Sequence, residues 1–400
     1  MKLRKKYAVA LAMVLAAAGV GTTVVLAPGA SAAVACAPAW SASAIYVKDN
    51  QVSYQSKNYT AKWWTTNEVP TASGQWGVWA DKGACGGVVD PTTPPTTPPT
   101  TGPTTPPATG TKMASAPYIY PGWGNPPAPS TVMSATGIKA FTIAFVLANG
   151  CNPVWDGEGG LTGGVHASTI AAIQAAGGSV VPSIGGWSGN KLGPNCATAE
   201  ALAGAYQKVI DAFGLKAIDI DIENSDEFEN TVVQDRILGA LKIVKQKNPS
   251  VKTILTFGTS PTGPNYYGIR LITQAKALGA NIDIFTQMPF DFGGGADMYA
   301  STVGASEGLK NQLKTTFGYT DAQAYSHMGI SGMNGLSDQQ ELTSVDTWTR
   351  IRDYAKNNNL ARFTFWAVNR DRGCAGGGVV SNCSGIAQAD WAFTKISAGF

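Results

Sequence analysis

Three acidic side chains alternate with isoleucines along residues 217–223. In a β-strand, Asp219, Asp221 and Glu223 lie on one face and the isoleucines lie on the other. Alternate residues on such a face are roughly 6–7 Å apart, so the carboxyl groups influence one another's pKa. A carboxyl group that stays protonated beside an ionised one can act as a general acid. The alternative interpretation is a solvated acidic stripe without catalytic chemistry.

The elements that must position these carboxyl groups lie in residues 113–400, where short apolar runs alternate with helix-length segments. Eight strands, each followed by a helix or a helix-sized segment, predict an α/β fold, the (β/α)8 TIM barrel. A doubly wound open sheet is the alternative, weakened because no G-x-G-x-x-G motif follows the first strand. The expected strands are residues 117–120, 140–147, 180–183, 217–223, 253–257, 282–290, 327–331 and 363–368. The expected helices are residues 167–176, 199–213, 230–246, 269–278, 305–315, 345–357 and 386–396.

A barrel makes the solvated stripe untenable, because a barrel strand has no solvated face along its length. Catalytic groups of such barrels lie at the C-terminal ends of the strands, and Glu223 ends the fourth expected strand. The carboxyl groups then fill the barrel mouth while the isoleucines pack on the surrounding helices. Like charges in this confined space raise one pKa, which predicts a Glu223 that is protonated near neutral pH.

Four motifs in chain order resemble those of glycoside hydrolase family 18, the chitinases. They are D-x-D-x-E at Asp219–Glu223, S-x-G-G at Ser183, Gly185 and Gly186, M-x-Y-D at Met288–Asp291, and Trp366. The resemblance covers residues 113–400. It implies a secreted, retaining hydrolase of the β-1,4 bonds in chitin and chito-oligosaccharides that needs no cofactor and no metal.

The resemblance also assigns roles. It implies that Glu223 protonates the glycosidic oxygen and that Asp221 orients the substrate's 2-acetamido group, which is the nucleophile. It implies that Asp219 supports Asp221 by sharing a proton, that Trp366 is the floor under the sugar, and that Asp291 contacts the acid or the sugar. Ser183, Gly185 and Gly186 let the third strand approach the carboxyl groups closely.

Two positions depart from the family's pattern. Lys216 and Ala217 replace an Asp-Gly pair that often precedes the signature, at a peripheral place where variation is expected. Phe290 replaces the tyrosine of M-x-Y-D, whose hydroxyl holds the acetamido group, and phenylalanine cannot donate a hydrogen bond. The candidates for a substitute are Gln287, Tyr120 and Tyr266. The substrate-binding set is completed by Met288 and Trp123.

Other residues near expected strand ends leave two interpretations open. Trp123, Trp155 and Trp187 suit sugar stacking and ordinary packing equally. His166 and His327 are expected to be structural, because no metal-ligand spacing surrounds them. The connection at residues 332–344 is short, whereas many exo-acting relatives insert a lobe there, so an open cleft and endo cleavage are expected.

Composition limits the partners of the chain. Residues 1–32 combine a basic start, an apolar run and Ala30–Ala32, which predicts a secretory signal peptide, with an uncleaved anchor as the alternative. Four of the 29 basic residues lie in that start, so 25 basic residues face 26 acidic ones in the rest. This balance argues against binding to nucleic acid or to a membrane surface, and an extracellular monomer is expected.

Six cysteines fall into pairs by region, which in an exported chain indicates disulfides. Cys36 and Cys85 bracket a small N-terminal segment, Cys374 and Cys383 close a Gly-rich loop, and Cys151 and Cys196 are left by elimination. Spacing alone does not establish this pairing. A zinc site is the alternative, but no Cys-x-x-Cys motif is present.

Residues 36–87 form a short aromatic segment that predicts a small all-β module. The pattern around Tyr59 and Trp64 resembles carbohydrate-binding modules of family 5/12, which implies chitin binding by these two rings; packing in the module's core is the alternative. Residues 88–112 are Pro/Thr-rich and predict an extended linker.

Two other functions fit parts of the pattern. A catalytically inactive chitin-binding or lectin-like protein on the same barrel is disfavoured by the intact Glu223. An endo-β-N-acetylglucosaminidase acting on N-glycans shares D-x-D-x-E, and only the chitin-type module and linker favour an insoluble polymer over it.

Overall fold

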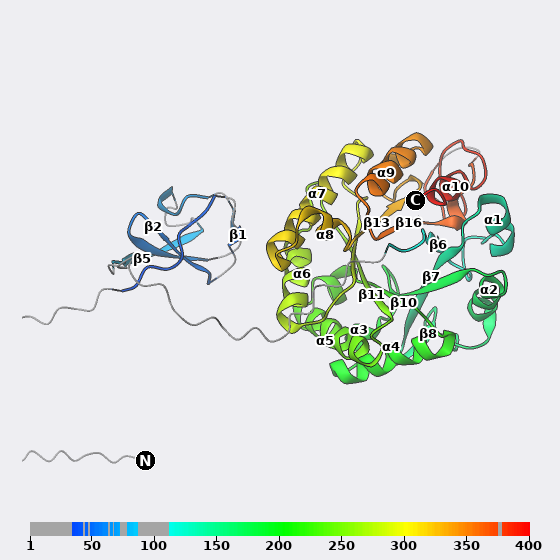
Figure 1. The fold of residues 1–400 in the computed structure, drawn as a ribbon, viewed down its shortest axis with the longest axis horizontal. Helices are drawn as coiled ribbons and strands as arrows, with labels where there is room; N and C mark the ends of the chain where they lie inside the picture. The colour runs from blue at the N-terminus through cyan, green and yellow to red at the C-terminus, as the bar shows by residue number, and fades with distance from the viewer. Residues whose placement is uncertain are drawn as a thin grey trace, which may run out of the picture. The chain divides into compact units, whose positions relative to one another are not determined.

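The computed structural model describes residues 34–42, 45–46, 49–62, 65–66, 68–72, 78–86, 112–374 and 378–400. The described residues form two compact units, one before and one after the proline-rich segment (Figure 1). The expected leader at residues 1–32, Trp64 and nearly all of the expected linker lie outside the described residues.

The N-terminal unit consists of short antiparallel strands in its described part. Strands β2 (Gln51–Tyr54), β3 (Lys57–Ala61) and β5 (Trp79–Ala84) form one sheet in the order β2-β3-β5. Strand β1 (Ile45–Tyr46) pairs with β4 (Thr65–Thr66), and a 3₁₀ turn, η1, spans Pro70–Ala72. A disulfide between Cys36 and Cys85 joins the two ends of the unit. So small a core needs such a covalent link to be stable.

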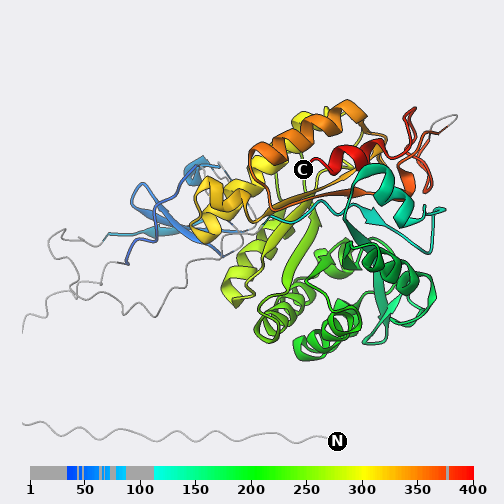
Figure 2. The ribbon, with the colours of Figure 1, turned by 45° about the vertical axis from the view of Figure 1, so that its right-hand side comes forward.

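The C-terminal unit is a barrel of parallel strands surrounded by helices (Figures 1 and 2). Its strands follow the order β6-β7-β9-β10-β11-β12-β13-β16, and neighbours pair in parallel. Backbone hydrogen bonds from Met113 N to Ala361 O (2.8 Å) and from Ala116 N to Phe363 O (3.4 Å) close the ring beside β6. The barrel strands are β6 (Tyr118–Ile119), β7 (Ala140–Asn149), β9 (Ser179–Gly185), β10 (Ala217–Asp221), β11 (Lys252–Gly258), β12 (Ile284–Met288), β13 (Met328–Met333) and β16 (Arg362–Trp366).

Helices connect successive barrel strands on the outside. The principal ones are α1 (Pro129–Thr136), α2 (Gly164–Ala175), α4 (Ala199–Phe213), α5 (Thr231–Lys247), α6 (Tyr266–Leu278), α7 (Met298–Phe317), α9 (Val345–Asn357) and α10 (Ala392–Ser397). The shorter elements are α3 (Leu192–Asn195), α8 (Asp321–Tyr325), the π-helical turn η2 (Asn224–Phe228) and the 3₁₀ turn η3 (Val368–Arg370). Three small strands complete the unit: β8 (Asn152–Trp155), β14 (Gly335–Leu336) and β15 (Leu342–Thr343).

Local sequence explains where several helices begin and end. Helix α4 begins after Thr198, whose side chain accepts a hydrogen bond from the backbone of Ala201, and ends at Gly214 in the left-handed conformation. Helix α7 begins seven residues before the expected 305, because the Asp297 carboxylate caps the N–H groups of Tyr299 and Ala300.

Two expected elements are shorter in the structure. The helix expected at residues 386–396 is wrong in its first half, because the Ile386 carbonyl accepts a hydrogen bond from the Cys374 backbone and only Ala392–Ser397 is helical. The strand expected at residues 217–223 ends at Asp221, and Glu223 is the extended residue that precedes η2. The short strand β8, which was not expected, pairs antiparallel with the end of β7.

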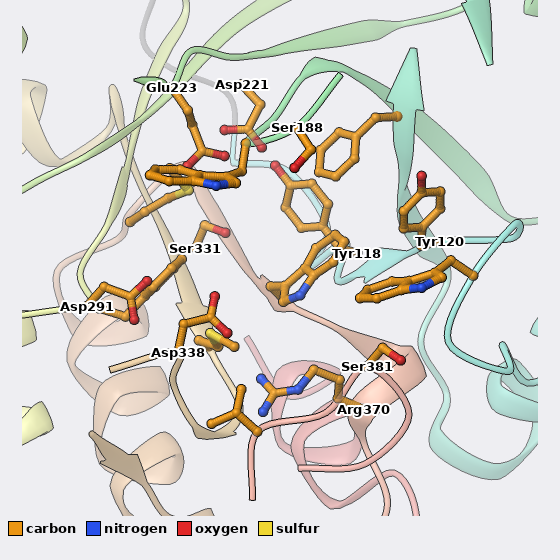
Figure 3. Close-up of a pocket in the computed structure, with 18 of the residues that line it drawn as sticks. Tyr118, Tyr120, Ser188, Asp221, Glu223, Asp291, Ser331, Asp338, Arg370 and Ser381 are labelled. Carbon is orange, nitrogen blue, oxygen red and sulfur yellow. The ribbon is translucent and has the colours of Figure 1, made fainter. Parts of the chain in front are cut away.

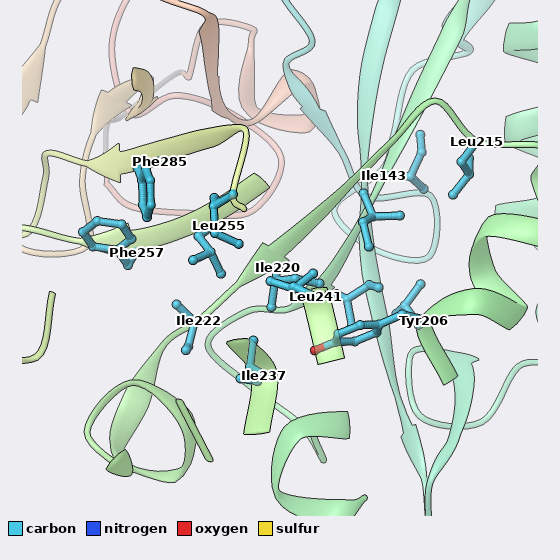
Figure 4. Packing of buried hydrophobic residues seen from close by; sticks show 14 of the residues in the cluster. Ile143, Tyr206, Leu215, Ile220, Ile222, Ile237, Leu241, Leu255, Phe257 and Phe285 are labelled. Carbon is cyan, nitrogen blue, oxygen red and sulfur yellow. The ribbon is translucent and has the colours of Figure 1, made fainter. Parts of the chain in front are cut away.

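The core lies in two places, outside and inside the ring of strands. Ile218, Ile220 and Ile222 are buried against the helices, as predicted, in a cluster that includes Ile237 and Leu241 of α5 (Figure 4). At the N-terminal ends of the strands, the interior is filled by Val181, Ala217, Ile254, Ile284 and Ala361. Packing of this kind on both sides of β10 holds its carboxyl groups at one position.

The first and last described residues of the C-terminal unit lie together. The Lys112 ammonium sits 3.9 Å from the centre of the Phe400 ring, and that ring packs on Phe363 at 5.2 Å between centroids. Phe363 belongs to the N-terminal part of β16, so both residues lie at the end of the barrel opposite the C-terminal strand ends.

Candidate active site

A buried ion pair crosses the middle of the barrel below the expected acid. Arg362 of β16 and Asp219 of β10 are both fully buried, with Nη1 and Oδ1 3.2 Å apart and Nη2 and Oδ2 3.3 Å apart. The same layer holds hydroxyl groups that satisfy most of the remaining donors and acceptors of the pair. Thr256, Ser183 and Tyr118 donate to Asp219, and Arg362 donates to Thr142, Thr256 and Thr286.

These contacts show what surrounds Asp219. The Asp219 carboxylate is held by a cation and three hydroxyl donors. Asp219 also acts on Asp221 through its negative charge, which raises the pKa of Asp221. We therefore assign Asp219 an electrostatic and structural role within the barrel.

Asp221 and Glu223 lie side by side at the mouth of the barrel (Figure 3). Asp221 is 3% exposed, and its Oδ1 has no hydrogen-bond partner among the described residues. Burial raises the pKa of Asp221 well above its usual range, and the charges of Glu223 and Asp219 add to that effect.

Glu223 is half-buried, and burial is the main reason why its pKa rises to about 7. The carboxylates of Asp291 and Asp338 raise the pKa of Glu223 further, while the Lys191 ammonium lowers it. The pKa of Glu223 is thus raised, as the sequence predicted. Its principal cause is burial, whereas the sequence suggested repulsion between neighbouring carboxylates. A glutamic acid that loses its proton near neutral pH suits general acid and general base catalysis alike.

A cavity of about 1120 Å³ opens above these groups at the C-terminal ends of the strands (Figure 3). Aromatic rings form one of its walls. Trp366, at the end of β16, stacks on Phe145 with ring centroids 5.5 Å apart and an angle of 15° between the planes. Tyr118 and Tyr120 contact the same indole, at 5.8 and 6.2 Å between centroids. An aromatic floor beside carboxyl groups provides an apolar face for the ring of a sugar.

The loop after β12 is tied to the β14–β15 hairpin by one buried carboxylate. Glu341 is 1% exposed and accepts hydrogen bonds from the N–H groups of Asp291 (3.2 Å) and Gly294 (2.9 Å) and from the Ser337 hydroxyl. Asp291 itself adopts a left-handed backbone conformation, and its carboxylate accepts from the Gln339 N–H at 3.2 Å. The loop thereby holds the carboxylate of Asp291 at the cavity wall.

The structure brings most of the expected substrate-binding residues to this cavity. Tyr120, Trp123, Met288, Phe290, Asp291 and Trp366 all line it. Gln287 does not: it is fully buried and donates to Ser306 of α7, because alternation along β12 turns it toward the helices. The expectation that Gln287 contacts substrate is therefore wrong. Tyr266, at the start of α6, is also outside the cavity lining.

The structure distinguishes exposed from packed rings among the three tryptophans for which both interpretations were open. Trp123 is 53% and Trp187 is 68% exposed at the cavity, whereas Trp155 is 2% exposed. Trp155 stacks on His166 at 4.7 Å, and His166 lies 3.1 Å from the Ala144 carbonyl, so both rings belong to the core. His327 contacts the Asp283 carbonyl through Nδ1 at 2.8 Å, which is also a structural contact.

The cysteine pairs are those that the spacing suggested. Disulfides link Cys36 with Cys85, Cys151 with Cys196, and Cys374 with Cys383. In the N-terminal unit, Tyr59 is only 4% exposed and packs in the core with Val52 and Trp79. The alternative interpretation therefore holds for Tyr59, and its ring is not available to stack on a sugar.

Sequence reasoning missed several residues of the site. Arg362 was outside the expected strand 363–368, since a charged residue next to an apolar run suggests a strand end. Tyr118 lies two residues before Tyr120 and could have been found from strand periodicity, whereas Phe145 reaches the cavity only because the register of β7 shifts between Ile143 and Val146. Further residues that line the cavity are Leu147, Asp156, Ser188, Ser331, Met333, Asp338, Arg370 and Val380, and these come mainly from loops.

The described residues contain no group of three or more His, Cys, Asp or Glu side chains arranged to hold a metal ion. Among their helices, none combines the length and the apolar character that crossing a bilayer requires.

Comparisons with known proteins agree on one group of relatives. A probable bifunctional chitinase/lysozyme of Escherichia coli is 26% identical over 353 residues, and Endochitinase 11 of Metarhizium anisopliae is 25% identical over 350 residues. Each alignment covers 84% of this chain, which spans 38% and 64% of the length of these two relatives. No protein-family model matches the chain.

The fold leads to the same group. Active domain 2 of the chitinase from Pyrococcus furiosus, solved as catalytic-site mutants, superposes with a TM-score of 0.66 at 25% identity, over 72% of this chain and 96% of that one. Its complex with chito-oligosaccharides gives a TM-score of 0.67 at the same identity, over 72% and 94% of the two chains. The motifs of the barrel resemble those of glycoside hydrolase family 18, the chitinases. The relatives and the solved structures together support this family.

Proposed function

We propose that this chain is a secreted chitinase that hydrolyses the β-1,4 bonds between N-acetylglucosamine units with retention of configuration. The observation that carries the proposal is the pair of carboxyl groups at the end of β10. The pKa of Glu223 is raised to about 7, and Oδ1 of Asp221 has no hydrogen-bond partner among the described residues. Both groups line the cavity together with the Trp366 ring. The relatives named above favour chitin as the polymer.

In the first step, Glu223 donates its proton to the glycosidic oxygen as the bond from that oxygen to the anomeric carbon breaks. The carbonyl oxygen of the substrate's own 2-acetamido group attacks the anomeric carbon and forms a cyclic oxazolinium ion. The acetamido N–H donates to Asp221, whose Oδ1 is the acceptor that this chemistry needs. The positive charge that develops on the ring is stabilised by the carboxylate.

In the second step, the ionised Glu223 removes a proton from water, and the water oxygen attacks the anomeric carbon as the bond to the acetamido oxygen breaks. The acetamide is regenerated, and Glu223 is again protonated. Two displacements on the same carbon give net retention, so neither protein carboxylate needs to form a covalent bond, unlike in the usual retaining scheme.

The decisive assay measures soluble sugars released from colloidal chitin by the wild type, by Glu223→Gln and by Glu200→Gln. Glu200 is an exposed glutamate in the first turn of α4, so its variant controls for the loss of a carboxylate. We expect Glu223→Gln to lose at least about 10³-fold in kcat while chitin binding persists, because the amide has no acidic proton to give. Substantial turnover by this variant would contradict the mechanism.

The same preparations distinguish the two other functions. A high-mannose glycoprotein serves as substrate for an endo-β-N-acetylglucosaminidase, and release of its glycan in preference to chitin oligomers would favour that activity. Chitin binding without turnover by the wild type would favour a lectin-like protein.

We further propose that the enzyme cleaves within chitin chains. The segment between β13 and α9 is the small β14–β15 hairpin, so no lobe rises over this side of the cavity in the described residues. An open cleft accepts the middle of a polymer. We expect the viscosity of a soluble chitin derivative to fall early in the digestion; release of dimers at constant viscosity would contradict endo cleavage.

The segments that precede the barrel are those expected of an enzyme that acts on an insoluble polymer outside the cell. We propose that residues 1–32 direct export, that residues 36–87 bind chitin and that residues 88–112 are a spacer, all within a monomeric protein. Three disulfides are compatible with an oxidising compartment. Deletion of residues 33–112 should reduce activity on insoluble chitin far more than on soluble oligomers; an equal loss on both substrates would assign the module another role.

A further inference from the structure

A buried lysine outside every motif described above is close enough to the candidate acid for its charge to act on it. The Lys191 side chain is 1% exposed, although a buried ammonium is costly unless it is paired. Its Nζ donates to the Asp226 carboxylate at 3.1 Å and to the Trp187 carbonyl at 3.2 Å. Lys191 directly precedes the short helix α3, so its backbone is anchored by a separate element.

Both partners of Lys191 are close to Glu223 along the chain or in space. Asp226 belongs to η2, the turn that follows Glu223 directly. The Trp187 carbonyl also accepts a hydrogen bond from the side chain of Asn224, the residue next to Glu223. The ammonium therefore ties the loop after β9 to the backbone that carries Glu223.

Trp187 gives this link a position in the cleft. Its ring is exposed and lines the main cavity together with Glu223. The same two residues also line a smaller cavity of about 350 Å³ with Asn224, Ser225 and Glu229. Movement of the loop would thus change both the wall of the cleft and the position of Glu223.

The charges around Glu223 are otherwise mostly negative. Asp221 is the last residue of β10, two residues before Glu223, and Asp291 and Asp338 come from the loops after β12 and β14 (Figure 3). Glu227 of η2 is 2% exposed, and burial raises its pKa to about 8. Two cations lie near these carboxyl groups. Lys191 lowers the pKa of both Glu223 and Glu227, and Arg370 lies beside Asp338 and Asp291.

We propose that Lys191 is a positioning residue for Glu223: its ammonium fixes the turn after the acid and supplies the positive charge behind the acidic cluster. The proposal rests on the function proposed above only in calling Glu223 the acid. The ammonium favours the ionised carboxylate, so it counteracts burial and keeps proton donation and proton removal both accessible near neutral pH. Without Lys191, Glu223 would hold its proton to higher pH and be a weaker acid in the first step.

The test compares Lys191→Met, Lys191→Gln and Lys191→Arg in the full chain. Methionine removes the charge at similar length, glutamine keeps a donor for the Trp187 carbonyl, and arginine keeps the charge. The first readout is the pH profile of kcat/KM on a soluble chito-oligosaccharide. The second is the titration of the Glu223 carboxyl carbon by 13C NMR, assigned with Glu223→Gln, which needs no catalytic activity.

We expect both uncharged variants to move the Glu223 midpoint and the alkaline limb of the profile upward by on the order of one pH unit. The sign follows because loss of a neighbouring cation disfavours the ionised carboxylate. Lys191→Gln keeps a polar contact in the buried site, so it still measures the effect of the charge if Lys191→Met does not fold. Lys191→Arg should leave the midpoint near that of the wild type.

An unchanged midpoint in Lys191→Gln, or an equal shift in Lys191→Arg, would overturn the proposal and assign Lys191 a purely structural role. The NMR titration decides this even if the wild type proves inactive on chitin. Failure of the proposed function would appear instead as absent turnover with the expected shift in the midpoint of Glu223.

Discussion

The ion pair inside the barrel yields a prediction of large magnitude. Arg362→Met keeps the length of the side chain but removes its charge and its donors, which leaves Asp219 buried without a cation. Loss of one partner of a buried pair costs about 3–5 kcal/mol, because the remaining charge is uncompensated. The three hydroxyl donors of Asp219 stay in place, so we expect a loss toward the lower end of this range.

The assay is thermal unfolding of the barrel followed by circular dichroism. A domain of this size shifts its midpoint by about 2 °C for each kcal/mol, so Arg362→Met should unfold about 6–8 °C below the wild type. The control is the double variant Arg362→Met with Asp219→Asn, in which no buried charge is left unpaired. We expect the double variant to recover most of the loss.

Two results would refute this reasoning. A single variant within about 1 kcal/mol of the wild type would mean that the hydroxyl groups alone satisfy Asp219. A double variant no more stable than Arg362→Met would mean that the lost packing, and not the uncompensated charge, causes the destabilisation.

Three further predictions concern the cleft. Because the pKa of Glu223 is raised to about 7 and the acid acts in its protonated form, kcat/KM should fall about tenfold per pH unit above roughly pH 7; a constant rate up to pH 9 would exclude Glu223 as the titrating acid. Trp366→Ala should lower kcat/KM by about 10–100-fold, since it removes the stacking surface, and Trp366→Phe should retain more activity than the alanine variant. Glu341→Gln should cost about 1–3 kcal/mol and raise KM, because its charged acceptor holds the loop of Asp291; a stable variant with unchanged KM would show that the loop does not depend on this carboxylate.

Strand periodicity carried most of the prediction of the fold. Alternation along β10 located the carboxyl groups inside the barrel and the isoleucines outside, and the order of the motifs assigned each to the correct strand end. Helix α7 begins earlier than predicted because the Asp297 carboxylate caps it. Strand β10 ends earlier than predicted because a π-helical turn follows it.

The interior chemistry was harder to predict because it depends on contacts across the barrel. Arg362 is 143 residues from Asp219 in sequence, and no local pattern connects them. The exposure of aromatic rings was equally hard to predict: Trp155 is buried while Trp187 is exposed, although both occur in similar polar and glycine-rich contexts. Periodicity predicts which face a residue takes, but tertiary neighbours decide whether that face is covered.

The meeting of Lys112 and Phe400 at the far end of the barrel has a consequence for how the domain can be rearranged. Since the two ends of the unit are adjacent, a short peptide could join them and new ends could be opened in an exposed loop without crossing the cleft. Such a circular permutant would keep every strand neighbour and every residue around Glu223. Partner domains could therefore be attached or exchanged at either terminus while the opening through which substrate enters stays unobstructed.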